Sequence, residues 1–97
     1  MDKKNPLKEL RESKGLSLKE MGLIVGLSYP NYYNLETGYT SRIPKRVLKI
    51  LGDVFKIDVV VFEKRFQDWI NEHREKVLEK VRWVEKLMEP LFLRVIG

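Results

Sequence analysis

The side chains in this sequence with the most to offer chemically are hydrogen-bonding groups gathered in one short segment. Two tyrosines and two asparagines, Tyr29, Asn31, Tyr33 and Asn34, fall within six residues. An asparagine amide can pair with N6 and N7 of adenine, and a tyrosine ring can pack on a thymine methyl group. The chain offers no recognisable Ser/His/Asp set, phosphate-binding loop or carboxylate pair, so we expect binding rather than catalysis.

The residue types needed for metal chemistry are nearly absent. There is no cysteine, and the single histidine, His73, cannot form a metal centre alone, so no metal or other cofactor is predicted. The longest stretch without a charged residue, 21–35, has fifteen residues and contains glycines and a proline, which makes it too short to span a bilayer. The N-terminus lacks the apolar run of a secretory signal, and a cytoplasmic location is expected.

The positive charge is concentrated in the first part of the chain. The net charge is +5 over 97 residues, and residues 1–58 hold eleven Lys or Arg against seven Asp or Glu. From residue 59 onward, eight basic residues face seven acidic ones, interleaved at spacings typical of a solvated helix face. The basic excess favours an anionic partner such as nucleic acid, with simple solubility as the alternative.

Apolar residues recur at helical spacing in nearly every window, which predicts an all-α chain. Pro6 begins a first helix that ends before Gly15, and Ser17 with Glu20 forms a capping box for a second. Ser28 is placed to cap a third helix. The predicted helices are 6–14, 18–25, 29–36 and one that begins at residue 44. The valines at 59–61 are poor helix formers, so a strand competes there, although no partner strand is evident.

Residues 18–37 have the features that a helix-turn-helix unit requires. Gly22 is small where two helices must approach closely, and Gly26 lies at the sharp turn, where a positive φ is easily adopted by glycine. Leu27 follows into the core, and Tyr32 and Leu35 lie three residues apart on the buried side of the third helix. The two asparagines and the other two tyrosines therefore face outward.

These stretches resemble the DNA-binding domain of phage lambda repressor and Cro, the Xre-type helix-turn-helix family, over residues 7–58. The matching segments are LKELRESKGLS, GLS at 26–28, NLETG at 34–38 and FKID at 55–58. The resemblance implies a lambda repressor-like five-helix domain, a recognition helix at 28–36, and a structural ion pair between Arg11 and Glu36. Leu18 stands where the family commonly has a glutamine that contacts the DNA backbone, so we expect that contact to be absent.

The resemblance and the helix geometry together give a set of expected DNA contacts. The major groove, about 12 Å wide, admits an α-helix, and the outward residues named above are expected to read bases. Contacts with the DNA backbone are expected from the helix N-terminus and from polar and basic neighbours, namely Lys19, Ser28, Tyr39, Thr40, Ser41, Arg42 and Lys45. Arg42 is the strongest candidate for a phosphate contact.

The second part of the chain predicts one long amphipathic helix. From Phe62 to Leu91 the apolar stripe, which includes His73 as a packed residue, advances by about 3.6 residues per step. This spacing favours compact antiparallel or swapped packing over a left-handed coiled coil. We expect a DNA-binding domain at 1–62 and a dimerisation extension at 63–97, with a dimer surface of Phe66, Ile70, Val77, Val81, Val84, Met88 and Leu91. The alternative is an intrachain hairpin with a break at 71–74.

These features predict a homodimeric, sequence-specific double-stranded DNA-binding transcriptional regulator, most simply a repressor that occludes a promoter. Xre-type domains usually read two-fold-related half-sites about 34 Å apart, which requires an element that holds two copies together. The alternative is a protein-interaction module, for instance the antitoxin of a toxin–antitoxin pair, whose C-terminal helix masks another protein. A membrane-surface helix is disfavoured because the charges of this segment are nearly balanced.

Overall fold

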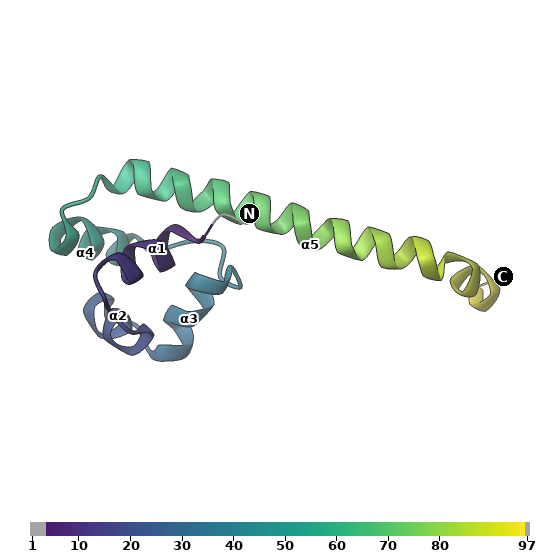
Figure 1. Ribbon diagram of the computed structural model, residues 1–97, viewed down its shortest axis with the longest axis horizontal. Coiled ribbons are helices and arrows are strands. Elements are labelled where there is room, and N and C mark those ends of the chain that lie inside the picture. Colours follow the sequence, from purple (N-terminus) through teal and green to yellow (C-terminus); the bar gives the residue numbers. More distant parts are fainter. Residues whose placement is uncertain (1–3, 97) are drawn as a thin grey trace.

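The computed structural model describes the backbone of residues 4–96 and the side chains of residues 4–83. Within these residues it contains five helices and no strand (Figure 1). They are α1 (Pro6–Ser13), α2 (Leu18–Val25), α3 (Tyr29–Thr37), α4 (Lys45–Phe55) and α5 (Val59–Ile96). The fold is all-α, as predicted, and the three valines considered as a strand form the first turn of α5.

The ends of the first helices follow from local sequence signals. Ser17 accepts a hydrogen bond from the Glu20 amide (3.1 Å), and the Glu20 carboxylate accepts one from the Ser17 amide (2.9 Å), so the predicted capping box is present. Gly26 ends α2 in the left-handed conformation, with φ of 74°. The amide of Leu27 then donates to the Gly22 carbonyl (2.9 Å), which fixes the sharp turn into α3.

Gly22 allows α2 and α3 to approach closely. A Cβ atom at this position would lie 3.1 Å from the Leu27 carbonyl oxygen and 3.7 Å from Cβ of Tyr32. The first of these distances is shorter than ordinary van der Waals contact, so a larger residue would push the turn outward. The close approach expected from the sequence at this glycine is therefore found.

Helices α1 to α4 pack together and are called the packed unit below. The hydrophobic core draws on all four of these helices and on the start of α5. Helix α5 packs against α1 and α4, while α3 packs against α1 and α2. The buried apolar side chains are Leu7, Met21, Val25, Tyr32, Leu35, Ile43, Val47, Leu48, Leu51, Phe62, Phe66 and Ile70.

Two residues expected at the dimer surface are buried in this core instead. Phe66 has 0% of its surface exposed and Ile70 has 8%. The first turns of α5 cover α1 and α4, so their apolar face is used within the chain and cannot contact a second copy. The core thus extends beyond residue 62, the expected domain boundary.

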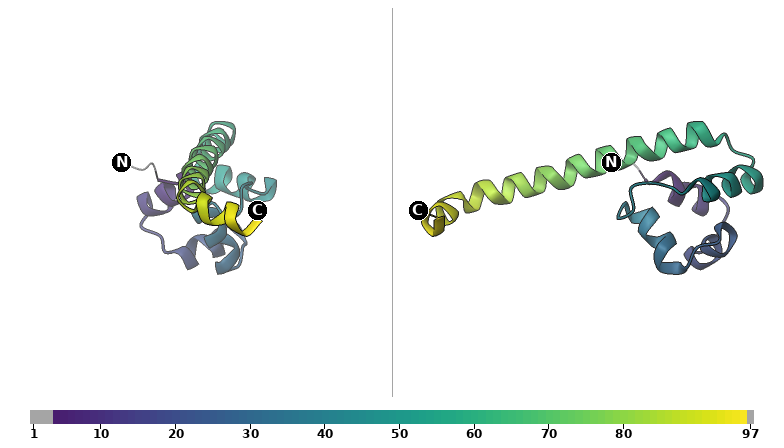
Figure 2. Two further views of the ribbon diagram at one scale, coloured as in Figure 1. Left: turned by 90° about the vertical axis from the view of Figure 1, so that its right-hand side faces the viewer. Right: turned by 180° about the vertical axis from the view of Figure 1, so that it is seen from behind.

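Helix α5 runs without a break through residues 71–74, so the alternative of an intrachain hairpin is wrong. Its C-terminal part projects away from the packed unit, and the molecule measures 58 × 25 × 24 Å (Figures 1 and 2). Every side chain described from Asn71 to Trp83 is exposed. Among the described residues, none of the helices is both long and apolar enough to cross a membrane.

Candidate nucleic-acid interface

The N-terminus of α3 is capped and open to solvent. Ser28 precedes the helix with an extended backbone, and its hydroxyl accepts a hydrogen bond from the Asn31 amide (3.4 Å). Pro30 lies in the first turn, where its missing amide hydrogen leaves no intrahelical bond unmade. The helix therefore begins as predicted and presents its positive dipole end to solvent, where a phosphate can bind.

The predicted base-reading residues lie on α3, with unequal access to solvent. Tyr29 and Tyr33 are 51% and 47% exposed, and their rings stack with a centroid separation of 6.2 Å and an interplanar angle of 6°. Asn31 is exposed, whereas Asn34 is half-buried. The two rings form a flat apolar surface on one flank of α3, whereas Asn31, two residues from each tyrosine, lies about 160–200° away around the helix axis, on the other flank of the exposed face.

The opposite face of α3 is fixed against the core. Tyr32 is fully buried, as predicted, and its hydroxyl makes no hydrogen bond within the described part of the chain. Burial raises the pKa of this phenol, and the nearby Glu36 carboxylate raises it further. Tyr32 therefore stays neutral and acts as a core residue, which leaves only the other side of α3 for a ligand.

An ion pair ties the last turn of α3 to α1. Arg11 donates from Nε to Oε2 of Glu36 (2.7 Å) and from Nη2 to Oε1 (3.1 Å), a bidentate arrangement. Its Nη1 also donates to the Leu16 carbonyl (2.9 Å). The hydrogen bond that Arg11 donates to the Glu36 carboxylate raises the pKa of Arg11. The pair implied by the family resemblance is present, and its partly buried position fits a structural role.

Asn5 provides a second tie that the sequence did not reveal. Its side chain is buried, with Nδ2 donating to the carbonyls of Leu35 (2.9 Å) and Glu36 (3.0 Å), while Oδ1 accepts from the Leu7 amide (2.8 Å). One amide thus caps the start of α1 and the end of α3. An Asn before Pro6 signals a helix N-cap, but nothing local indicates that its other end reaches a segment thirty residues away.

The end of α3 also lies against α5. Gly38 has φ of 82°, and a Cβ atom there would lie 2.8 Å from Cζ3 of Trp69 and 3.2 Å from Cδ2 of His73. These two side chains stack with ring centroids 4.8 Å apart. His73 therefore stacks on Trp69 near Gly38, but its side chain is exposed and is not packed in the core as expected. Helices α1 and α5 together hold the C-terminal end of α3.

The residues expected to contact the DNA backbone fall into two groups. Lys19, Ser28 and Lys45 lie at the N-terminal ends of α2, α3 and α4, whereas residues 39–42 lie in the loop from α3 to α4. Arg42 and Lys45 are both exposed. Tyr39 is 85% exposed. Among the described residues, none of the three cations takes part in a salt bridge. Their charges are therefore available to an anion.

Two residues of this loop have backbone groups that are already used. The Thr40 amide donates to the Asn34 carbonyl (3.0 Å), and the Ser41 carbonyl accepts from Nε2 of Gln67 on α5 (3.0 Å). The Thr40 amide is therefore unavailable to a phosphate, and only its side chain remains for the contact expected of it. These bonds hold the loop beside α3 and α5.

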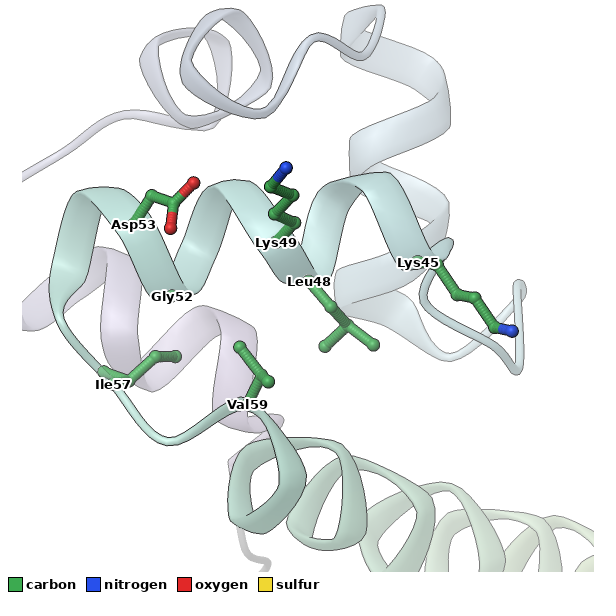
Figure 3. A pocket seen from close by; sticks show the side chains of 7 residues that line it. All are labelled: Lys45, Leu48, Lys49, Gly52, Asp53, Ile57 and Val59. Atoms are coloured by element: carbon green, nitrogen blue, oxygen red, sulfur yellow. The ribbon is translucent and has the colours of Figure 1, made fainter.

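A hollow lies between α4 and the start of α5. Its volume is about 520 Å³, and its lining residues are Lys45, Leu48, Lys49, Gly52, Asp53, Ile57 and Val59 (Figure 3). Leu48, Ile57 and Val59 point toward one another, whereas the charged ends of Lys49 and Asp53 point away from them (Figure 3). In the described part of the chain, no three His, Cys, Asp or Glu residues gather to hold a metal ion.

Helices α2 and α3 are short and meet at the Gly26 turn. Helix α3 is exposed along one face and is held at its end by α1. This arrangement is that of a helix-turn-helix domain of the DNA-binding type. A family model described as helix-turn-helix matches residues 7–62, which is more than half of the chain. The chain belongs to this family, the Xre or lambda repressor-like type of DNA-binding regulators. No curated protein and no solved structure matches the chain significantly.

Proposed function

We propose that this protein is a homodimeric, sequence-specific double-stranded DNA-binding regulator that acts in the cytoplasm as a transcriptional repressor. Helix α3 enters the major groove of each half of a two-fold-symmetric operator, and promoter occlusion follows from occupancy. The main support is the exposed face of α3, which carries the stacked Tyr29 and Tyr33 on one flank and Asn31 on the other, on a helix held at its far end by α1.

The side chains of this face suit base edges rather than phosphates. Asn31 carries a donor and an acceptor that match adenine N7 and N6 in the major groove, and Asn34 offers a second, less accessible amide. The two stacked tyrosines offer ring surface to a thymine methyl group. An operator rich in A·T pairs at the contacted positions is therefore expected.

Sequence-independent affinity comes from the cations beside α3. Lys19, Arg42 and Lys45 are exposed, and among the described residues they are not neutralised by an acidic partner. By contrast, Lys4, which precedes α1, and Lys8, on α1, both lie near the carboxylate of Glu12, at 2.9 Å and 3.9 Å. When Lys19, Arg42 and Lys45 contact phosphates, counterions are released from the DNA, so binding weakens as the salt concentration rises.

The test is a selection of binding sites from random duplexes, followed by affinity measurements at several salt concentrations. We expect a two-fold-symmetric consensus and a steep negative slope of log K against log salt. The control is a duplex of the same length and scrambled sequence, which should bind with similar salt dependence but much lower affinity. Equal affinity for both duplexes would refute sequence-specific regulation.

A second candidate is an antitoxin-like module whose α5 covers a partner protein such as a toxin. The exposed apolar side chains of Val77, Val81 and Trp83 favour a protein contact of some kind along this helix. The two candidates differ in the isolated protein: self-pairing gives a stable dimer, whereas a masking helix leaves a monomer or an aggregate. Sedimentation of the purified chain separates them.

A further inference from the structure

The projecting part of α5 presents apolar side chains that nothing in the described chain covers. Val77 and Val81 are each 46% exposed, and Trp83 is 65% exposed. From residue 71 to the end of α5 at 96, the helix spans about 39 Å at 1.5 Å per residue. Apolar side chains left in water along a helix mark a surface that a partner can cover, because burying them is favourable.

The free apolar face points toward the side on which the packed unit lies. Val77 and Val81 follow Ile70 by seven and eleven residues, which places them within about 20° of it around the helix axis. Ile70 faces the core, and the end-on view shows α1 to α4 on one side of α5 (Figure 2). The partner must therefore lie along that same side, beyond the packed unit.

We propose that this face binds the projecting helix of a second copy in antiparallel orientation. The proposal specifies the interface of the homodimer proposed above and rests on it. A parallel pair would place both packed units between two helices whose axes lie about 8–10 Å apart. The molecule is 24–25 Å across, and a helix accounts for only about 10 Å of that, so parallel units would overlap. Antiparallel pairing separates them to opposite ends.

The length of the projecting part fixes the register. Its midpoint lies between residues 83 and 84, and overlap centred near this point keeps the two packed units at opposite ends of the pair. The nearest register that places apolar positions opposite one another pairs Val81 with Val84 of the second copy, and Val77 with Met88. Side chains from residue 84 onward lie outside those described, so these positions follow from sequence spacing alone.

Spacing and charge both suit a second copy of this chain. Ile70, Val77, Val84 and Leu91 are seven residues apart, which is a period of 3.5. The longer average period found in the sequence came from including Phe62 and Phe66, which the core uses. The exposed part therefore fits coiled-coil packing, contrary to the sequence expectation. Residues 71–96 hold six basic and five acidic residues, so two copies do not repel strongly.

Cysteine cross-linking tests the orientation, because the chain has no cysteine of its own. In the antiparallel register, a mixture of Val77→Cys and Met88→Cys proteins forms a mixed disulfide on oxidation, and neither variant cross-links efficiently alone. Parallel pairing would instead cross-link Val77→Cys with itself, which would overturn the proposal. The matched control is Glu79→Cys mixed with Met88→Cys, since Glu79 lies on the opposite face and should not cross-link.

A second variant tests whether this face holds the dimer together. Val81→Glu should raise the dimer dissociation constant by about 100-fold, because an unpaired charge is placed in the interface. Glu79→Gln lies on the opposite face of the helix and should change the dissociation constant little. Circular dichroism checks that the packed unit stays folded in both. A monomeric parent protein would overturn the proposed interface, and so would a Val81→Glu dimer with an unchanged dissociation constant. A stable dimer that shows no preference among DNA sequences would refute only the DNA-binding function.

Discussion

Replacing Gly38 by alanine should destabilise the protein more than the same change at Gly26. Both glycines end a helix in the left-handed conformation, with φ of 82° and 74°. At Gly26 a Cβ atom meets nothing within 4 Å, whereas at Gly38 it lies 2.8 Å from the Trp69 ring. The two substitutions therefore share a backbone cost and differ in one steric contact with α5.

The magnitudes follow from these two contributions. A left-handed conformation costs a residue with a Cβ atom about 1–2 kcal/mol, which is the whole effect expected for Gly26→Ala. Gly38→Ala adds an overpacking cost of about 1–3 kcal/mol, because the Trp69 ring must shift and His73 is stacked on it. We expect a total near 3 kcal/mol for Gly38→Ala. Trp69→Leu should remove most of the difference between the two glycine variants.

The assay is urea unfolding followed by far-ultraviolet circular dichroism, with all variants at one protein concentration because self-association of any kind makes the apparent stability depend on concentration. The Gly38→Ala cost is measured in the parent and in the Trp69→Leu background, which isolates the contact in a double-mutant cycle. Equal costs for Gly26→Ala and Gly38→Ala would refute the packing of α5 against the end of α3. A cycle with no coupling between Gly38 and Trp69 would refute it as well.

Three further predictions concern capping and DNA contacts. Asn5→Ala should cost about 1–3 kcal/mol in urea unfolding, since two buried carbonyls lose their donor; a cost near zero would contradict this. The hydrogen bonds with Ser17 lower the pKa of Glu20 in the folded protein. The ionised Glu20 carboxylate therefore stabilises the fold at pH values above its pKa in the unfolded chain, and this stabilisation is lost as the pH falls through its lower pKa in the folded protein. Glu20→Gln should flatten that acid dependence, and an unchanged profile would count against the capping box. Asn34→Ala should relax base preference at one position by about 1–3 kcal/mol, whereas Arg42→Ala should weaken all duplexes alike; equal losses from both would contradict the assigned roles.

The sequence predicted α1 to α3 and their corners well because the signals there are local. A capping box needs only Ser17 and Glu20, and a left-handed corner needs only Gly26, so each can be found without knowing the rest of the fold. The outward face of α3 followed from the same periodicity, which placed Tyr32 inside and Tyr33 outside. Within such a window, helical geometry alone decides which side chains share a face.

The roles of Phe66 and Ile70 could not be found this way. Periodicity shows that a helix has an apolar face, but it does not show whether that face is covered by the same chain or by another. The stripe from Phe62 to Leu91 appears continuous in the sequence, yet the structure uses its first three members inside the core and leaves Val77 and Val81 exposed. Whether a given part of the stripe is covered by the same chain depends on the contacts of α5 with α1 and α4. The contacts with α1 join residues that are distant in sequence.

The contacts of α3 explain how a helix of nine residues can hold a fixed orientation. Its last turn is fixed from three directions, by the Asn5 amide, by the Arg11 guanidinium and by the Trp69 ring behind Gly38. Its first turn carries the exposed polar side chains. Because a short helix tilts as a unit, restraint at one end sets the direction of the other. The same helix α5 that supplies Trp69 also carries the exposed Val77 and Val81, so one continuous helix joins the end of α3 to this apolar face.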